Sequence, residues 1–351
     1  MQQQTDVQSP PPGPPHFEPR VPFRWRWVLT IALAAIITFA AFLVPIPIFY
    51  AYLPGPVRDV ERLVEVDEAR TYSSEGSLYL TTVSVDINVT FAEWVQALLD
   101  DTRQIVSRES VTGGRSFDDL EEQQLLEMKQ SKQQAREVAL TTLGYEPPTG
   151  EGARVLQTFE GSPAAANLER DDVIVAVDGE AVETTCDASE LIGGHEPGDD
   201  VTLEVRRNGT ERTVRLTTAQ NPQEPAEAFV GVFMETVGYR FDPGVEVKFK
   251  TGNIAGPSAG LMFTLALYDQ LTPEDLTHGQ RIAGTGTIGC GGEIGPIGGI
   301  QQKVAAAQSE GATVFLAPEG NYEEARQVAG DIRVVKVATF DDARIFLEGL
   351  Q

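Results

Sequence analysis

A serine among small residues is the first candidate for chemistry in this sequence. It lies in the stretch Gly256-Pro257-Ser258-Ala259-Gly260, and an apolar helical pattern follows at once. Proline suits the first turn of a helix, so we expect Ser258 at a helix N-terminus. Backbone N–H groups are free there and can hold a developing negative charge on a bound carbonyl oxygen. The alternative is a small-residue turn that only opens a core helix.

A serine hydroxyl needs a base before it becomes a useful nucleophile. The three histidines of the chain lie in polar surroundings or in the N-terminal tail, and we expect them on the surface: His16, His195 and His278. We favour Lys303 as the base, because desolvation and a helix N-terminus both lower the pKa of a lysine. Thr285 could accept a hydrogen bond from the neutral amine. A Ser-His-Asp site that uses His278 is the alternative.

Strands and helices alternate around these residues. Apolar and charged residues alternate in 245–250, which predicts a half-buried strand that runs into the Ser258 loop. The helix after Ser258 is expected to end near Leu271. The elements expected after it are helix Ile300–Ser309, strand Thr313–Ala317, helix Tyr322–Ala329, strand Ile332–Val337 and helix Asp341–Leu350. Their alternation predicts an α/β layer structure.

Three motifs of this region resemble the proteolytic domain of the Lon proteases. They are the stretch around Ser258, then Thr285-Gly286-Thr287-Ile288, and then the segment from Gly295 to Lys303. The resemblance implies that Ser258 is a nucleophile and that Lys303, 45 positions later, is its base. It places Thr285 near the lysine and gives supporting roles to the neighbours of the serine: Gly256, Pro257 and Ala259. Many family members carry an acidic residue where this chain has Ala255, which bears on substrate positioning but removes neither partner.

A second segment resembles a PDZ domain of the bacterial secreted-protease type. The resemblance rests on Gly161-Ser162-Pro163-Ala164-Ala165, on Val177-Asp178-Gly179-Glu180, and on a hairpin signalled by Asn208-Gly209. Asp171 stands where the family usually has glycine, and aspartate tolerates a left-handed turn. PDZ domains bind peptides at a sheet edge. The strand expected at 153–158 would then line the groove with Ala153, Arg154, Val155 and Leu156. A spacer without a ligand is the alternative.

The N-terminal segment has the composition of a membrane anchor. An uncharged apolar stretch of 18 residues runs from Trp27 to Val44, which is about 27 Å as a helix. Aromatic residues mark the two expected interfaces: Trp25 and Trp27 at the start of the stretch, and Phe49, Tyr50 and Tyr52 after it. Arginines precede the stretch, which predicts a cytoplasmic N-terminus and an extracytoplasmic remainder. A cleaved signal peptide is the alternative.

Composition excludes several other functions. The 351 residues include 52 acidic and 27 basic side chains, and the net charge of −25 argues against nucleic-acid binding. The glycines of 284–289 fit G-x-G-x-x-G but run into further glycines instead of a helix, so we expect no dinucleotide site. No P-loop motif is present in the sequence, and we expect neither a cofactor nor a metal. Cys186 and Cys290 are expected as free, buried thiols, with a disulfide as the alternative.

These observations predict an α+β protein with one transmembrane helix, a small β-rich PDZ-like domain and a Lon-type α/β domain. The expected order is a disordered cytoplasmic tail at 1–23, an anchor at 24–53, bracing elements at 57–149, a PDZ-like domain at 150–219 and a proteolytic domain at 226–351. The bracing elements include a strand at Ser77–Val85 and helices at Phe91–Asp101 and Phe117–Leu143. We expect an ATP-independent, membrane-anchored serine endopeptidase that acts on extracytoplasmic or membrane-associated polypeptides. By analogy with Lon-type domains, we also expect homo-oligomers. A catalytically inert membrane-anchored scaffold is the alternative.

Overall fold

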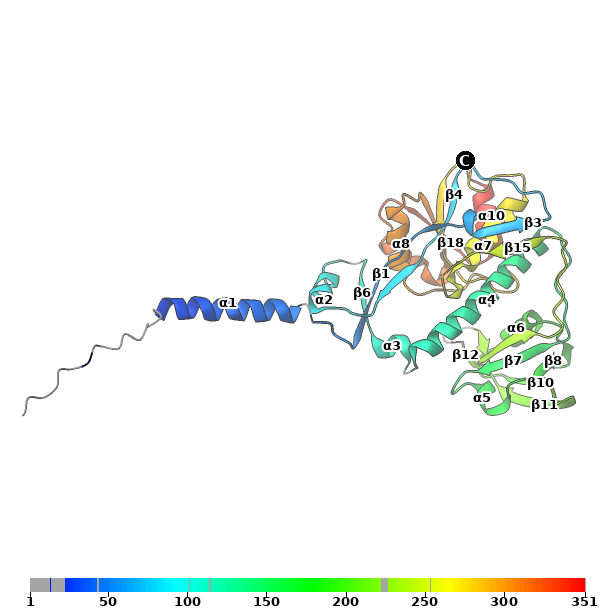
Figure 1. Ribbon diagram of the computed structural model, residues 1–351. Coiled ribbons are helices and arrows are strands. Elements are labelled where there is room, and N and C mark those ends of the chain that lie inside the picture. Colours follow the sequence, from blue (N-terminus) through cyan, green and yellow to red (C-terminus); the bar gives the residue numbers. More distant parts are fainter. Residues whose placement is uncertain are drawn as a thin grey trace, which may run out of the picture.

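The computed structural model describes residue 13 and residues 23–42, 44–100, 102–113, 115–221, 227–252 and 254–350. Two folded bodies lie on either side of a long helix, α4 (Phe117–Thr142), and a further helix, α1 (Phe23–Phe42), projects away from them (Figure 1). We call the bodies the α/β domain and the β-rich domain. The tail expected at 1–23 falls outside the described residues, except for Gly13 and Phe23.

The α/β domain is built on a five-stranded sheet in the order β18-β17-β16-β4-β2. Its strands are β2 (Arg58–Asp59), β4 (Ser77–Leu80), β16 (Arg281–Gly284), β17 (Val314–Pro318) and β18 (Arg333–Val337). Four of them are parallel, and only β2 at one edge runs antiparallel to its neighbour. Strand β4 comes from the segment that was expected only to brace this domain, so the sheet needs residues from both halves of the chain.

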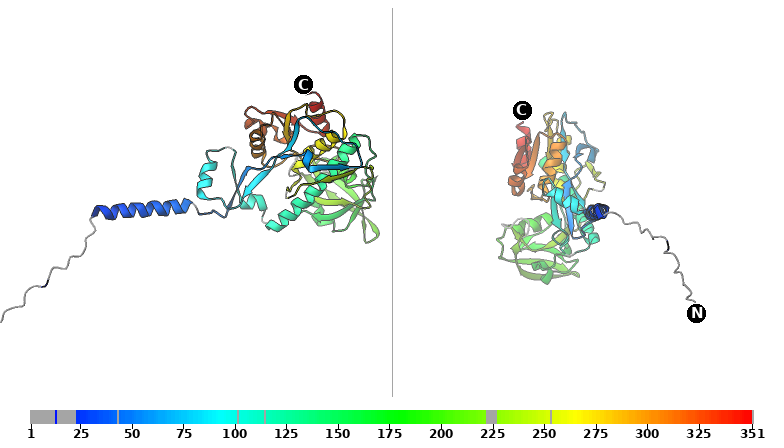
Figure 2. Two further views of the ribbon diagram at one scale, coloured as in Figure 1. Left: turned by 45° about the horizontal axis from the view of Figure 1, so that its top comes forward. Right: turned by 90° about the vertical axis from the view of Figure 1, so that its left-hand side faces the viewer.

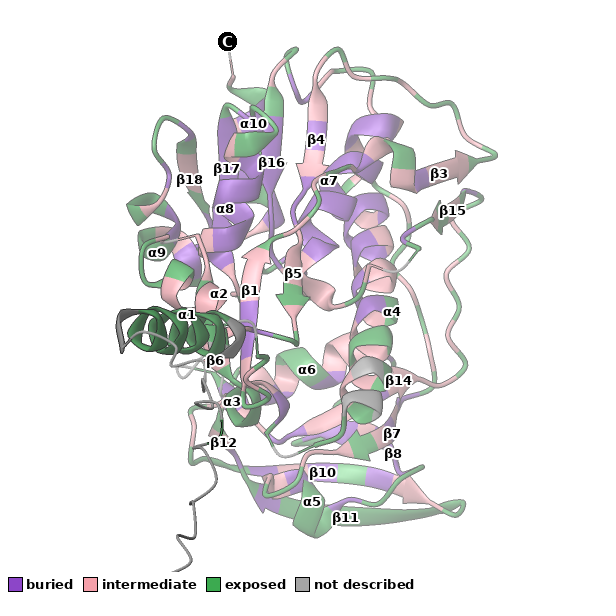
Figure 3. Ribbon diagram, turned by 60° about the vertical axis from the view of Figure 1, so that its left-hand side comes forward, coloured by how far each residue is buried: buried purple, intermediate pink, exposed green. Residues whose placement is uncertain are grey.

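Helices cover both faces of this sheet. They are α7 (Gly260–Leu271), α8 (Ile300–Ser309), α9 (Tyr322–Gln327) and α10 (Phe340–Glu348). Side chains alternate along each strand, so Ile282 and Leu316 pack with α4, α7 and α10, whereas Ala283 and Phe315 pack with α8 and α9. Helix α7 is buried along almost its whole length, as its colour in Figure 3 shows. The alternation of strands and helices predicted from the sequence is confirmed here.

Residues 77–86 form two strands instead of the single strand expected at Ser77–Val85. The chain leaves β4 at Leu80, and β5 (Val83–Asp86) joins a second sheet, with the order β5-β1-β6. The break lies at Thr81 and Thr82, where Thr82 accepts a backbone hydrogen bond from Gly55. The remaining elements of this region are β1 (Phe49–Pro54), β3 (Val64–Asp67), α2 (Phe91–Ala97), β6 (Gln104–Ser107), α3 (Arg108–Thr112) and β15 (Glu246–Phe249).

The anchor expected at 24–53 is corrected at its C-terminal end. Strand β1 pairs with β5 and β6, and Tyr50 is buried, so Phe49, Tyr50 and Tyr52 belong to the folded body instead of marking a membrane interface. Helix α1 projects away from the folded bodies (Figure 2), and its described side chains, most of them apolar, are exposed (Figure 3). Among the residues that the structure describes, no helix meets the combined length and hydropathy needed to cross a bilayer.

The β-rich domain is an antiparallel sheet in the order β11-β10-β8-β7-β14, with β9 paired to β8. Its elements are β7 (Ala153–Thr158), α5 (Pro163–Asn167), β8 (Val173–Val177), β9 (Glu180–Ala181), α6 (Thr185–Gly193), β10 (Asp200–Arg207), β11 (Thr210–Thr217) and β14 (Val232–Thr236). A short pair, β12 (Ala219–Gln220) and β13 (Ala228–Phe229), precedes β14. The domain boundary expected at 226 had placed residues 232–236 in the α/β domain. They belong to the β-rich domain, because β14 pairs with β7.

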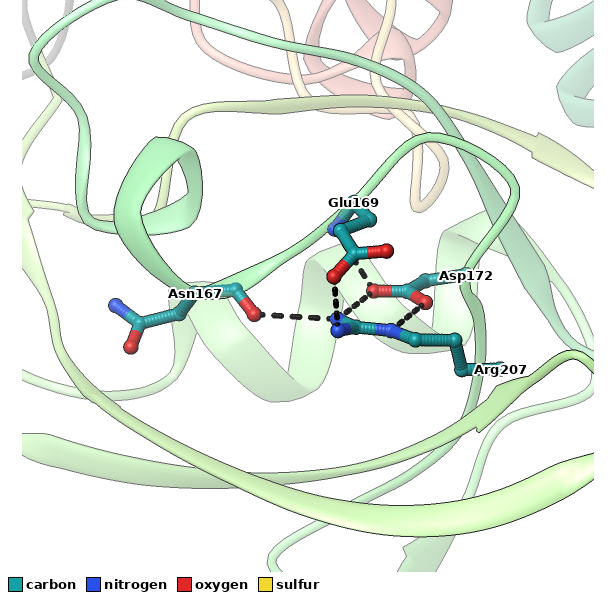
Figure 4. Close-up of polar contacts among 4 residues, drawn as sticks. All are labelled: Asn167, Glu169, Asp172 and Arg207. Atoms are coloured by element: carbon teal, nitrogen blue, oxygen red, sulfur yellow. Dashed lines mark hydrogen bonds and ion pairs between the residues drawn. The ribbon is translucent and has the colours of Figure 1, made fainter.

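Local turn chemistry in this domain follows the sequence. Asp171 adopts a left-handed conformation with φ of 70°, as expected for a residue that replaces glycine. Asn208 and Gly209 have φ of 52° and 76° and close the β10–β11 hairpin. The Arg207 guanidinium donates two hydrogen bonds of 2.6 Å to the buried Asp172 carboxylate. It also forms an ion pair with Glu169 and donates to the carbonyl of Asn167 (Figure 4). This cluster fixes the turn before β8 to the hairpin.

The two bodies are covalently joined. Cys186 at the start of α6 forms a disulfide with Cys290, which lies in the glycine-rich loop of the α/β domain. The expectation of two free thiols is therefore wrong. The partners are 104 positions apart, and only the fold brings them together.

Candidate active site

Ser258 lies in a short 3-10 turn, Pro257–Ala259, that leads directly into α7. The expectation of a helix N-terminus is confirmed. Gly256 precedes the turn with φ of 86°, a conformation that favours glycine. A methyl group on Gly260 would lie 2.6 Å from Ile288 and 2.8 Å from Oγ of Ser131, so only glycine fits the first position of α7.

Lys303 projects from the first turn of α8 toward the serine. Its Nζ lies 2.8 Å from Oγ of Ser258 and 2.9 Å from Oγ1 of Thr285. The lysine is only 3% exposed, and no carboxylate forms an ion pair with it among the described residues. Burial lowers the pKa of Lys303 from 10.5 to about 7. A large fraction of the amine is therefore neutral near pH 7 and able to act as a base.

Thr285 determines the direction of the hydrogen bonds around the amine. Its hydroxyl donates to the backbone carbonyl of Ser258 over 3.0 Å, so its oxygen is left to accept from Lys303. A neutral amine that donates to Thr285 keeps its lone pair for the hydroxyl proton of Ser258. The structure thus brings together the three residues that the sequence singled out, and it gives the threonine the accepting role expected for it.

A cleft of about 910 Å³ opens over Ser258 and Lys303. Its apolar lining includes Leu63, Leu80, Val83 and Ile254, and its cationic lining consists of Arg58, Lys250 and Lys303 among the described residues. The supporting residues expected beside the serine, Gly256 and Ala259, also line it, as does Ala255. The cleft is large enough for several residues of an extended polypeptide.

The histidines lie elsewhere. His278 is exposed in the loop between α7 and β16 and does not line the cleft. His195 is half-buried in the β-rich domain, where one ring nitrogen lies 2.8 Å from Asp178 and the other 2.9 Å from the carbonyl of Leu191. Its expected exposure is therefore wrong, whereas His16 lies outside the described residues.

The structure also shows a site neighbour that was not foreseen from the sequence. Ser131 of α4 is buried, and its hydroxyl donates to the carbonyl of Pro257 over 3.0 Å. From the sequence, this helix was expected only as a bracing element. A stripe of small and apolar residues at helical spacing, Met128, Ser131, Ala135 and Val138, could have marked the face that packs on the serine loop.

The groove residues expected in the β-rich domain are not at an edge of its sheet. Ala153, Arg154, Val155 and Leu156 belong to β7, which is paired with β14 on one side and with β8 on the other. The sheet has two edge strands, β11 and β14, and β14 is the one that contacts α6. There the side-chain amide of Gln130 in α4 donates to the carbonyl of Met234 over 3.2 Å.

Comparison with known families assigns the two bodies. Residues 117–218 match the PDZ domain family, and residues 242–344 match the Lon protease (S16) C-terminal proteolytic domain. The chain combines a PDZ domain with a Lon-type proteolytic domain. The α/β domain is thus the proteolytic domain, and its sheet also recruits β2 and β4 from outside the matched residues.

Curated relatives match parts of the chain. It is 36% identical over 92 residues to a Lon protease of Campylobacter concisus, covering 25% of this chain and 11% of that protein. It is 36% identical over 106 residues to a Lon protease of Frankia alni, covering 29% and 12%. A DegP-like periplasmic serine endoprotease of Pseudomonas fulva is 32% identical over 87 residues, covering 24% and 18%. The matches span less than a fifth of each of these relatives.

Solved structures also resemble one part of the chain. The PDZ domains of SdrC-like proteins from Listeria monocytogenes and Listeria innocua share 19% and 20% sequence identity with it. Each covers 24% of this chain, with 87% and 92% of the respective domain aligned and TM-scores of 0.23 and 0.22.

Proposed function

We propose that this protein is an ATP-independent serine endopeptidase in which Ser258 is the nucleophile and Lys303 its general base. One observation carries the proposal: a buried amine with a pKa of about 7 lies 2.8 Å from a serine hydroxyl at the floor of a cleft. A lysine serves as a base only where its pKa is depressed in this way. The proposal of ATP independence rests on the absence of a P-loop motif from the sequence.

The reaction would begin when the neutral amine of Lys303 takes the hydroxyl proton of Ser258. The serine oxygen then bonds to the carbonyl carbon of a peptide, and the carbonyl oxygen becomes an oxyanion held by backbone N–H groups at the start of α7. When the intermediate collapses, Lys303 gives its proton to the leaving amine. Water then hydrolyses the acyl-serine by the same two steps, and the amine again acts first as base and then as acid.

A serine-reactive fluorophosphonate probe tests the nucleophile directly. We expect the full chain to be labelled at Ser258, and labelling to increase with pH as Lys303 loses its proton. The Ser258→Ala variant removes the reactive oxygen and is expected to take no label. Labelling of the wild type that persists in Ser258→Ala, or no labelling of either protein, would favour the inert-scaffold alternative.

We also propose that the PDZ domain binds extended polypeptides at the edge of β14. An added strand would satisfy the backbone groups along this edge. Gln130 of α4 already occupies the carbonyl of Met234, so a bound polypeptide would have to replace that contact. Met234→Pro should weaken peptide binding, and a proline in an exposed loop should leave it unchanged. That result would support the edge of β14 as the binding site.

We further propose that the segment before β1 attaches the enzyme to a membrane, with the folded domains outside the cytoplasm. The apolar side chains of α1 are exposed, among them Trp25, Ile31 and Phe39. A disulfide joins the two domains, and such bonds persist mainly in oxidising compartments. Cell fractionation should place the full chain in the membrane fraction, and added protease should digest its C-terminal part in spheroplasts. Recovery in the cytosolic fraction would contradict this location.

A further inference from the structure

Helix α4 contacts the serine loop through the buried hydroxyl of Ser131 and through the carbonyl of Gln124, which accepts a hydrogen bond from the N–H of Gly256 over 3.4 Å. Ser131 is 2% exposed, and its Oγ donates to the carbonyl of Pro257 over 3.0 Å. The contact is close on both sides, because a methyl group on Gly260 would lie 2.8 Å from the same oxygen. Ser131 therefore packs closely against Pro257, which precedes Ser258, and against Gly260, which follows the 3-10 turn.

The peptide group between Pro257 and Ser258 is constrained by two hydrogen bonds to its carbonyl oxygen, one from Oγ of Ser131 and one from the backbone N–H of Gly260 in the 3-10 turn. Described peptide bonds are all trans, and in a trans peptide the carbonyl and the N–H point in opposite directions. When the Pro257 carbonyl faces Ser131, the N–H of Ser258 faces away from α4. Gly256 precedes this peptide with φ of 86° and contributes no side chain to restrain it.

Helix α4 is itself held firmly in position. Neighbouring residues bind other segments: Gln130 donates to Met234 of the PDZ domain, and Lys132 donates to Oγ1 of Thr251 over 2.7 Å. Further along, Glu137 accepts from the Tyr239 hydroxyl over 2.7 Å. These contacts fix the rotation of the helix, so Ser131 is presented to the loop at a defined place.

We propose that Ser131 is a positioning residue that turns the N–H of Ser258 toward the oxygen of the scissile carbonyl. The proposal rests on the peptidase function proposed above. Ser131 does not touch substrate in this account. It acts through the Pro257–Ser258 peptide, whose N–H stabilises the oxyanion only in one orientation. The general base is untouched, because Lys303 contacts the serine side chain from α8.

The test is Ser131→Ala in the full chain, assayed by cleavage of a fluorogenic peptide and by crystallography. Removal of one oxyanion donor typically lowers kcat by about 100- to 1000-fold, and misorientation should cost part of that, about 10- to 100-fold. We expect KM to stay within about twofold, and the pH at half-maximal kcat/KM to stay unchanged, because the base is intact. Alanine is a good helix former, so α4 should persist.

Thr141→Val is the matched control. It also removes a hydroxyl from α4, but that hydroxyl bonds only to carbonyls of its own helix, such as Glu137 at 2.5 Å. We expect kcat of this control to stay within about twofold of the wild type. In crystals of Ser131→Ala, the Pro257 carbonyl should turn from its wild-type direction while Nζ of Lys303 stays within hydrogen-bond distance of Ser258.

An unchanged kcat in Ser131→Ala, or an unchanged peptide orientation in its crystals, would overturn the proposal. A shift of the pH profile with kcat lowered would overturn it too, since that would place the effect on Lys303. If the wild-type protein cleaves nothing, the peptidase function fails, and the crystals still decide whether Ser131 orients this peptide group.

Discussion

Nζ of Lys303 and Oγ of Ser258 lie 2.8 Å apart, although 45 positions separate the residues in the chain. The lysine reaches the serine from α8, while the serine begins the buried helix α7, so the contact is set by the packing of two helices on opposite faces of one sheet. An unpaired lysine in such a place is costly when charged. That cost leads to the first prediction.

Lys303→Met should stabilise the protein at low pH. Burial lowers the pKa of Lys303 from 10.5 to about 7, so below pH 7 the folded state holds a buried charge. The unfolded state binds more protons between pH 7 and 10.5, and wild-type stability therefore rises with pH across that window. The full difference corresponds to an upper bound of about 5 kcal/mol.

Urea unfolding at pH 6, 8 and 10 measures this effect. The free energy of unfolding of Lys303→Met should exceed that of the wild type at pH 6, and the gap should narrow toward pH 10. Lys129→Met, which replaces an exposed lysine of α4, is the control and should show no such narrowing gap. A variant less stable than the wild type at pH 6 would contradict a destabilising buried charge on Lys303.

Thr285→Val should lower kcat/KM by about 10- to 100-fold, because the neutral amine loses the acceptor that directs its lone pair. Thr285→Ser keeps the hydroxyl and should retain most of the activity. Thr287→Val, two residues further along the same segment, is the control and should stay within about twofold. Equal activity in Thr285→Val and the wild type would remove the threonine from the mechanism.

The disulfide should contribute substantially to stability. A disulfide between residues 104 positions apart restricts the conformations of the unfolded chain. Loss of such a bond lowers the free energy of unfolding by about 2–5 kcal/mol. Cys186→Ser combined with Cys290→Ser should therefore lower the free energy of unfolding by that amount. Wild-type protein treated with a phosphine reductant should fall to the same value. Equal unfolding midpoints with and without reductant would show that the bond does not stabilise the fold.

Arg207→Ala should destabilise the PDZ domain by about 3–5 kcal/mol. The side chain of Asp172 is fully buried, and removal of the guanidinium leaves its charge with the backbone N–H of Glu169 but without a cationic partner among the described residues. Arg206→Ala is the matched control, since that neighbour only donates to the exposed carbonyl of Glu151. Urea unfolding followed by a probe in the PDZ domain should separate the two variants, and equal midpoints would argue against the cluster in Figure 4 as a stabilising unit.

Local features of the fold could be predicted from the sequence. The turn at Asn208-Gly209, the left-handed Asp171 and the helix after Ser258 each depend on residues adjacent in the chain. The grouping of Ser258, Lys303 and Thr285 was expected because three separate motifs resemble one family. The cause in each case is short-range chemistry or a recognisable pattern.

Long-range features could not be predicted in this way. Pairing of Cys186 with Cys290 depends on how two domains pack, and nothing in the spacing of two cysteines reports that. Strand β14 returns to the PDZ sheet after β12 and β13, so β7 is interior, and the predicted groove was placed one strand away from the edge. Ser131 was overlooked because its partner, the carbonyl of Pro257, is a backbone group 126 positions away.

The most direct test of the Ser258–Lys303 site is the pH dependence of peptide cleavage by the full chain without ATP. The site predicts that kcat/KM rises with pH through an apparent pKa near 7, as Lys303 loses its proton, and then reaches a plateau. Ser258→Ala should be inactive, and Lys303→Arg should be inactive too because arginine stays charged. Cleavage that survives in Ser258→Ala, or a full rate in Lys303→Arg, would contradict it.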